Sequence, residues 1–261
     1  MSSNIVLKAS ELNKSFSGIV AAKDINVSIN QGEIIGIIGA NGAGTTVFVN
    51  MITGYLKPTS GKIEFMGSDI TGIEPRKATH IGLCRSFQIS QVFMTMTVKQ
   101  NLMIAMSLAK KSGKTLLDPI EDESISKECD TILKLYKILD QKDNIVSTLS
   151  QGIRKLLDIA MAVVGNPKVI LLDEPTSGVS VEEKFGIMDI VIAALKQTET
   201  SVLFVEHDME IVERYVDRVI AFYQGEIEKL QEKMMFLRKD IQITNLCIEI
   251  IEQEKVVDIR E

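Results

Sequence analysis

The sequence is poor in the residues that build metal sites and disulfide frameworks. It has no tryptophan, three cysteines and two histidines among 261 residues. Because Cys84, Cys129 and Cys247 are far apart and lack C-x-x-C spacing, we expect buried free thiols. No apolar run approaches the roughly 18 residues of a membrane span, and residues 1–10 lack the basic and apolar regions of a signal peptide. We therefore expect a soluble, cytosolic chain.

The chain also has no excess of positive charge, with 29 Lys and Arg residues against 35 Asp and Glu residues. The formal net charge is −6, and no basic stripe is apparent. Binding to a phosphate backbone needs a basic surface, so we expect no nucleic-acid partner. The sequence does have 45% hydrophobic residues, enough for a core in one large α/β domain with subdomains or in two small domains.

Hydrophobic periodicity predicts a mixed α/β chain. The expected strands are residues 4–9, 24–30, 34–38, 62–66, 81–84, 169–174, 201–206 and 218–223. The expected helices are residues 46–52, 74–79, 97–109, 125–139 and 150–163, followed by charged amphipathic helices at 227–238 and 248–259. A methionine-rich run in the helical part (Met94, Met96, Met103 and Met106) suits adaptable core packing, although such a surface can also dock a partner helix.

The segment from Glu33 to Val47, EIIGIIGANGAGTTV, contains the most informative pattern. A β-branched run typical of a buried strand is followed by Gly39, Gly42 and Gly44 and then by a predicted helix. Strand, glycine loop and helix is the order of a phosphate site, because backbone N–H groups converge on an anion in front of the positive helix N-terminus. The alternative is a plain strand-to-helix turn.

One residue departs from the phosphate-loop pattern. After Gly39-x4-Gly44 a P-loop has lysine, and here the residue is Thr45. Threonine offers a short neutral hydroxyl where lysine would bring a positive charge to the β and γ phosphates. Thr46 keeps the hydroxyl expected on Mg²⁺. The lysine of residues 112–115 is a decoy, because no strand or first glycine precedes it.

Other chemically suited residues lie at the predicted ends of strands and helices. Asp173 and Glu174 follow a buried strand, at the edge where open α/β sheets bind ligands, and could serve a metal and a water. Gln88 follows another strand and offers an amide oxygen to a metal or water. His207 ends a third; a lone histidine is usually structural, but this position favours a phosphate-sensing role. Ser150 is a natural cap for the helix that begins with it.

An aromatic side chain lies between the first two predicted strands. Phe16 is expected in a polar loop, where an exposed ring could stack on a nucleotide base. An equally good interpretation is a residue at the rim of the core.

Together these residues resemble the ATP-binding cassette of ABC transporters over about residues 5–225. The matching motifs, in order, are the aromatic A-loop (Phe16), Walker A (39–46), the Q-loop (Gln88), the signature (149–153), Walker B (169–174), the D-loop (177–180) and the H-switch (His207). Residues 85–88, 96–102 and 206–212 are similar to importers of branched-chain amino acids and related amides.

The resemblance implies an α/β fold with a P-loop NTPase core, an antiparallel β subdomain and a helical subdomain at about residues 90–160. It implies an ATP-binding domain over residues 1–225 and a helical C-terminal tail over 226–261. It further implies a second ABC ATPase chain, identical or different, paired head to tail so that ATP lies between the P-loop of one chain and the signature of the other. Integral-membrane permease subunits would hold the chain on the inner face of the membrane and contact its helical subdomain.

The resemblance also assigns roles to individual residues, with ATP and Mg²⁺ as cofactors. The implied Mg²⁺ ligands are Thr46, Gln88 and Asp173. The implied catalytic residues are Glu174, which polarises water, His207, which contacts the γ phosphate, and Gln88. The implied nucleotide contacts are Phe16, Gly39, Asn41, Gly42, Ala43, Gly44, Thr45 and Thr46, with Ser150 and Gly152 facing the nucleotide of the partner chain.

Several positions depart from the family pattern: Thr45 replaces lysine, Ile153 the signature glutamine, Met161 an arginine and Ser180 the D-loop aspartate or asparagine, and the tail after Gly225 lacks a second glycine turn. Two functions are therefore open. The chain is either a transport ATPase, with activity intact or impaired, or a subunit that binds nucleotide weakly without hydrolysing it. Asp173, Glu174, Gln88 and His207 favour the first. Thr45 and Ile153 favour the second.

A third possibility is a cytosolic ABC protein of the translation or DNA-repair type. It is less well supported, because the chain has one cassette, no long coiled coil and no basic face.

Overall fold

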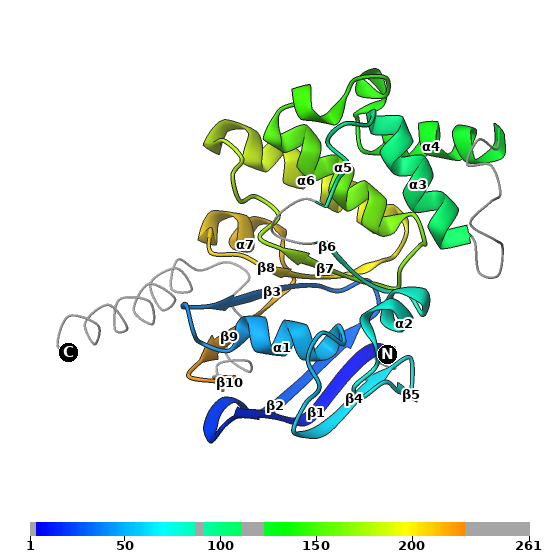
Figure 1. Ribbon diagram of the computed structural model, residues 1–261. Helices are drawn as coiled ribbons and strands as arrows, with labels where there is room; N and C mark the ends of the chain where they lie inside the picture. Colours follow the sequence, from blue (N-terminus) through cyan, green and yellow to red (C-terminus); the bar gives the residue numbers. More distant parts are fainter. Residues whose placement is uncertain (1–3, 87–90, 111–122, 228–261) are drawn as a thin grey trace. The chain divides into compact units, whose positions relative to one another are not determined.

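The computed structural model describes residues 4–86, 91–110 and 123–227, and the chain divides into two compact units. The first unit contains Met1–Pro75 and Leu203–Glu261, and the second contains Arg76–Val202. Figure 1 labels the helices and strands of both. The predicted tail helices and Cys247 lie outside the described residues.

An antiparallel sheet forms one layer of the first unit. Its strand order is β2-β1-β4-β5, with β1 at Ile5–Phe16, β2 at Ile19–Asn30, β4 at Ser60–Phe65 and β5 at Ser68–Asp69. Both β2 and β4 pair with β1, and Ala9 lies opposite Val27 on one side and Ile63 on the other. The predicted alternation of β2 is confirmed, because Ile25, Val27 and Ile29 are buried.

The expectation that Phe16 lies in a loop is wrong. Strand β1 continues to Phe16, which pairs with Ile19 across the tight turn at Ser17 and Gly18, where φ is +46° and +93°. Register shifts between Ala9 and Leu12 interrupt the alternation that would have predicted so long a strand.

The first unit also contains part of a six-stranded sheet with the order β10-β9-β3-β8-β7-β6, and the glycine loop follows one of these strands. Strand β3 (Ile34–Gly39) is parallel to β9 (Arg218–Tyr223), with Ile37 opposite Ile220, and β10 (Glu226–Ile227) is antiparallel to β9. On its other side β3 neighbours β8 (Ser201–Val205), inside which the boundary between the units falls. The expected buried strand at 34–38 is confirmed, and helices α1 (Thr45–Ile52) and α7 (Met209–Tyr215) belong to the same unit.

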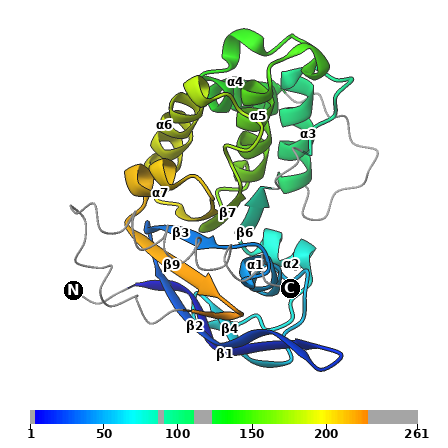
Figure 2. The same cartoon turned by 90° about the vertical axis from the view of Figure 1, so that its left-hand side faces the viewer.

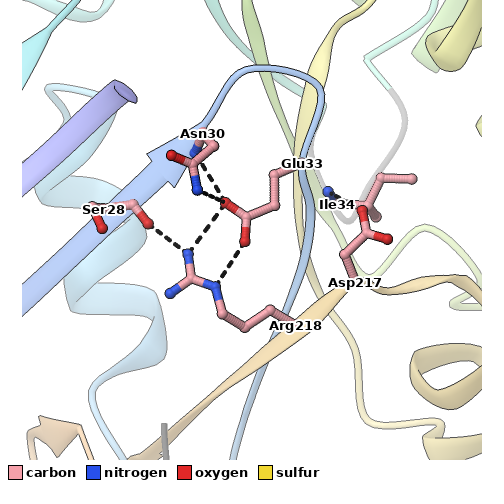
Figure 3. Close-up of polar contacts among 6 residues, drawn as sticks. All are labelled: Ser28, Asn30, Glu33, Ile34, Asp217 and Arg218. Carbon is pink, nitrogen blue, oxygen red and sulfur yellow. Dashed lines mark hydrogen bonds and ion pairs between the residues drawn. The ribbon is translucent and has the colours of Figure 1, made fainter. Parts of the chain in front are cut away.

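A cluster of polar contacts joins the turn before β3 to β2 and β9 (Figure 3). Arg218 Nε donates to Glu33 Oε1 over 2.8 Å, and Arg218 Nη2 donates to the carbonyl of Ser28 over 2.5 Å. Glu33 Oε2 accepts from the backbone N–H of Asn30 at 2.9 Å. The side chains of Arg218 and Glu33 are each only 15% exposed, so this pair fixes the start of β3 relative to both sheets of the unit.

The second unit is mainly helical. Its parallel strands β6 (Leu83–Ser86) and β7 (Val169–Asp173) pair with Arg85 opposite Leu171. Helices α3, α4, α5 and α6 pack in succession against one another (Figures 1 and 2). The helical elements are α2 (Pro75–His80), α3 (Val98–Lys110), α4 (Glu123–Leu135), α5 (Gln151–Val163), α6 (Val181–Gln197) and the short η1 (Leu139–Gln141) and η2 (Val146–Thr148).

Two helical details differ from expectation. The helix expected at 125–139 ends at Leu135, because Lys137 takes a φ of +55° and the N–H of Ile138 donates back to Leu133 over 2.9 Å. Of the methionine-rich run only Met106 is a core residue, and Met94 is exposed.

Two further expectations concern thiols and membrane spans. Cys84 and Cys129 are buried thiols outside any disulfide, as expected, and burial raises the pKa of Cys84 to about 11. No helix in the described part of the chain has the length and apolar character needed to cross a membrane.

Candidate functional site

The glycine loop in the first unit makes a tight turn between β3 and α1. It leaves β3 at Gly39 and enters α1 at Thr45, with φ values of +87° at Gly42 and +100° at Gly44. A Cβ at Gly44 would lie 2.9 Å from the carbonyl oxygen of Ala21, so only glycine fits there. The carbonyl of Ala43 accepts from the N–H of Gly225 over 3.0 Å, which anchors the loop to the turn after β9.

The two threonines that follow the loop have different environments. Thr46 is exposed in the first turn of α1, where a hydroxyl can reach a ligand. Thr45 is only 8% exposed. Its methyl group packs beneath the loop, 2.9 Å from the position of a Cβ on Gly39. Thr45 therefore fills the base of the loop, and the described residues of the first turn of α1 carry no acidic side chain that would repel phosphate.

His207 lies at the same edge of the sheet as the glycine loop. It lies two residues beyond the end of β8, and the N–H of the intervening Glu206 donates to the carbonyl of Ile37 in β3 over 3.3 Å. The imidazole residue is exposed, whereas Glu206 is buried. Asp208 then caps α7 by accepting from the N–H of Glu210 over 3.0 Å. The first unit thus places the loop and His207 at the ends of neighbouring strands.

Phe16 is available for contact at the tip of the β1–β2 hairpin. The residue is 45% exposed, and Lys14 Nζ lies 5.0 Å from its ring centroid. The same ammonium donates to the carbonyl of Lys57 over 2.8 Å. The ring of Phe16 is therefore held by a cation–π contact with Lys14 and is not buried in the core.

Phe16→Ala is expected to weaken ATP and ADP binding similarly, by about 1–3 kcal/mol, because a base–aromatic stack would be lost. Nucleotide affinity per folded molecule checks this prediction, with Phe16→Tyr as the matched control that keeps the ring. A loss confined to stability would support the interpretation as a rim core residue.

In the second unit Asp173 ends β7 with a partner that the sequence analysis did not suggest. Its Oδ2 lies 2.5 Å from a terminal nitrogen of Arg85 on the neighbouring strand β6. Glu174 follows with φ at +45°, a left-handed conformation that is uncommon for a non-glycine residue. Its carbonyl accepts from the N–H of Ser177 over 3.1 Å, so the chain turns sharply after the two carboxylates.

The signature segment begins α5 as predicted. Ser150 is the N-cap, and its Oγ accepts from the N–H of Ile153 over 3.4 Å. Gly152 is buried against α6, where a Cβ would lie 2.6 Å from Cδ1 of Ile187. A side chain at position 152 would therefore require the tip of Ile187 to move. Ser180 occupies the N-cap position of α6, where its hydroxyl donates to Glu183 Oε2 over 3.2 Å and makes no capping hydrogen bond with the helix backbone.

Asp158 of α5 is a buried polar residue that the sequence analysis did not identify. Its Oδ2 accepts from Ser86 Oγ at 2.7 Å and its Oδ1 from the N–H of Gln91 at 2.8 Å. It therefore contacts the described residues on either side of 87–90, and Gln88 itself lies outside the described residues. Burial raises the pKa of Asp158, and the hydrogen bonds from Ser86 and Gln91 oppose that shift.

Asp158→Asn is expected to gain stability relative to the parent chain as the pH rises from about 4 to about 7. The raised native pKa means that the folded chain holds this proton more tightly than the unfolded chain, so the parent loses stability once the pH passes the ordinary range of aspartate. Asparagine can still accept from Gln91 and donate to Ser86.

Thermal unfolding across that pH range, with exposed Asp143→Asn as the control, measures the difference between variant and parent. A constant difference would contradict the burial argument.

The donor atoms assigned to Mg²⁺ fit that ion chemically. They are hydroxyl, carboxylate and amide oxygens, and Mg²⁺ is usually bound by one or two carboxylates together with phosphates and waters. Thr46 is exposed and Asp173 lies at a strand end, although the two belong to different units. The described residues hold no group of three or more His, Cys, Asp or Glu side chains that could bind a metal ion.

Comparison with known proteins places the chain among transport ATPases. A model of the ABC transporter family matches residues 22–177. The probable branched-chain amino acid transport ATP-binding protein LivG of Archaeoglobus fulgidus is 33% identical over 228 residues, which cover 85% of this chain and 87% of that protein. The high-affinity LivG of Escherichia coli K12 is 31% identical over 226 residues, covering 84% and 89%.

A solved structure gives the same result. The ADP conformation of an ATP-binding cassette of an ABC transporter matches with a TM-score of 0.79 and 30% identity, and covers 94% of this chain and 98% of its own.

Proposed function

The chain belongs to the ABC transporter family as an ATP-binding cassette, and on this basis we propose that it couples ATP hydrolysis to import of branched-chain amino acids or related small solutes. Its fold is that of a P-loop ABC ATPase. The observation that carries the proposal is the glycine loop between β3 and α1, with exposed Thr46 in the helix and His207 at the neighbouring strand end. Converging N–H groups at a helix N-terminus suit a triphosphate.

We assign the chemical steps to residues of this chain. The loop backbone binds phosphate, Phe16 stacks on the base and His207 contacts the γ phosphate. Thr46, Gln88 and Asp173 would hold Mg²⁺, which would supply positive charge to the transferred phosphoryl group. Glu174 orients the attacking water and accepts its proton. Ser150 and Gly152 contact the nucleotide bound to the partner chain.

The assembly proposed for this function is a head-to-tail pair of ABC ATPase chains, either homodimeric or heterodimeric, on permease subunits. The chain would then be peripheral on the inner face of the cell membrane. Residues 1–225 would form the ATP-binding domain, with a helical subdomain at about 90–160, and residues 226–261 a helical tail. The relatives named above are ATP-binding proteins of amino acid transport, which supports this arrangement.

A second candidate function is a partner subunit that binds nucleotide without hydrolysing it. The observation in its favour is Thr45, whose neutral side chain is packed beneath the loop where a P-loop lysine would supply charge. An intact second cassette would then carry out hydrolysis.

Three measurements on the purified chain, alone and with co-purified permease subunits, test these functions. Labelled ATP is titrated with Mg²⁺, phosphate release is followed, and uptake of labelled leucine is compared with that of Glu174→Gln. Saturable binding with Glu174-dependent release and uptake is expected. Binding without release in either setting would support the second candidate, and no binding at all would contradict both.

A further inference from the structure

Arg85 and Asp173 form an ion pair between adjacent parallel strands. Arg85 lies opposite Leu171, and Asp173 is two residues farther along β7, so both side chains are on the same face of the sheet. A terminal nitrogen of Arg85 lies 2.5 Å from Asp173 Oδ2. The Arg85 side chain is 9% exposed and that of Asp173 22%. The carboxylate assigned to Mg²⁺ therefore already has a cation beside it.

That cation is permanent. A guanidinium is always charged in proteins, so a second cation that approaches Asp173 meets a full positive charge there. The strand end that carries it is also fixed, because the adjacent Ser86 donates to Asp158 of α5 over 2.7 Å. A second cation at Asp173 must either share the carboxylate with the guanidinium at close range or replace it, and like charges at that distance repel.

We propose that Arg85 is the resident counter-ion of Asp173 and that Mg²⁺ must compete with its guanidinium for this carboxylate during nucleotide binding. This inference rests on the proposed function. Arg85 is a positioning residue here, since it acts through Asp173. Arg85 reduces the gain in nucleotide affinity that Mg²⁺ provides. In the absence of Mg²⁺, its positive charge offsets the negative charge of Asp173, which would otherwise repel the phosphates.

The test compares ATP dissociation constants measured in Mg²⁺ and in EDTA. Removing the competing cation in Arg85→Met should raise the ratio of the EDTA value to the Mg²⁺ value by at least about fivefold, the lower end of ordinary coupling between two binding events. Arg85→Lys keeps a charge and should stay near the parent ratio. A falling ratio would mean that Arg85 supports the metal, and an unchanged ratio would mean that the pair is only structural. Either result overturns the proposal.

The matched control is Arg218→Met. It breaks another part-buried arginine–carboxylate pair, with Glu33, whose carboxylate is not assigned to metal. It should lower stability and leave the Mg²⁺ dependence of nucleotide affinity unchanged. If Arg85→Met alone folds poorly, the double variant Arg85→Met with Asp173→Asn removes both charges and should bring the ratio to or below that of the parent. A ratio that stays high in the double variant would contradict the assignment to Asp173.

Binding of Mn²⁺ without nucleotide, followed by electron paramagnetic resonance, provides a readout independent of ATP. Arg85→Met should bind Mn²⁺ more tightly than the parent chain, and Arg218→Met should not. If no variant bound ATP while this Mn²⁺ difference was present, the proposed function would fail and the competition at Asp173 would stand. Equal Mn²⁺ affinity in Arg85→Met and the parent would overturn the competition.

Discussion

Glu174→Gln is expected to lower ATP hydrolysis by about 10²–10⁴-fold and to leave MgATP affinity unchanged, because a neutral amide cannot accept the proton of the attacking water. Glutamine has nearly the same shape, and the neighbouring Asp173, assigned to the metal, is untouched. The backbone at position 174 is also well defined, since Glu174 has a φ of +45° and its carbonyl accepts a hydrogen bond from the N–H of Ser177.

Phosphate release and nucleotide affinity, measured on the same preparation, separate the two effects of Glu174→Gln. Glu182→Gln is the control, because Glu182 is an exposed residue of the first turn of α6 with no assigned role. Equal turnover in Glu174→Gln and the parent chain would remove Glu174 from the mechanism. Loss of MgATP affinity would instead place it among the binding residues.

The parts of the fold that local periodicity determines could be predicted. A short β-branched run bounded by glycines is typical of a buried strand rather than of a helix, and β3 occupies residues 34–39. The helix cap at Ser150 could also be predicted locally, because a serine just before an apolar-periodic segment can accept a hydrogen bond from a nearby backbone N–H. Helix α6 was missed although its buried residues recur at helical spacing, because the continuous apolar run at 190–195 obscures the period.

The contacts that tune the site could not be predicted, because they join residues distant in sequence. Arg85 and Asp173 are 88 positions apart, and Ser86 and Asp158 are 72 apart. Their pairing depends on the register of β6 with β7 and on the packing of α5, and no motif encodes either. One signal was present: Asp158 interrupts the apolar face of α5, and a buried acid needs donors.

Thr45→Lys is expected to raise turnover by about 10²–10³-fold, because it restores a preorganised cation where negative charge develops in the transition state. Affinity for ATP should rise less, since the charge acts more strongly on the transition state than on the bound substrate. The backbone needed for this gain is in place, with left-handed glycines at 42 and 44 and Thr46 exposed in α1. Lysine must leave the space that the Thr45 methyl fills beside Gly39 and extend along the loop.

The control for the lysine variant is Thr45→Met, which has similar length and no charge. A gain in Thr45→Lys that is absent from Thr45→Met assigns the effect to the ammonium rather than to the emptied space beneath the loop. If affinity rises without turnover, the defect lies outside the loop, and Ile153 and Ser180 are the next residues to restore. If neither rises, the loop is not shaped for phosphate, because a cation placed at the start of a phosphate-cradling helix must strengthen binding. That result would favour a plain strand-to-helix turn and would contradict the assignment of residues 39–46.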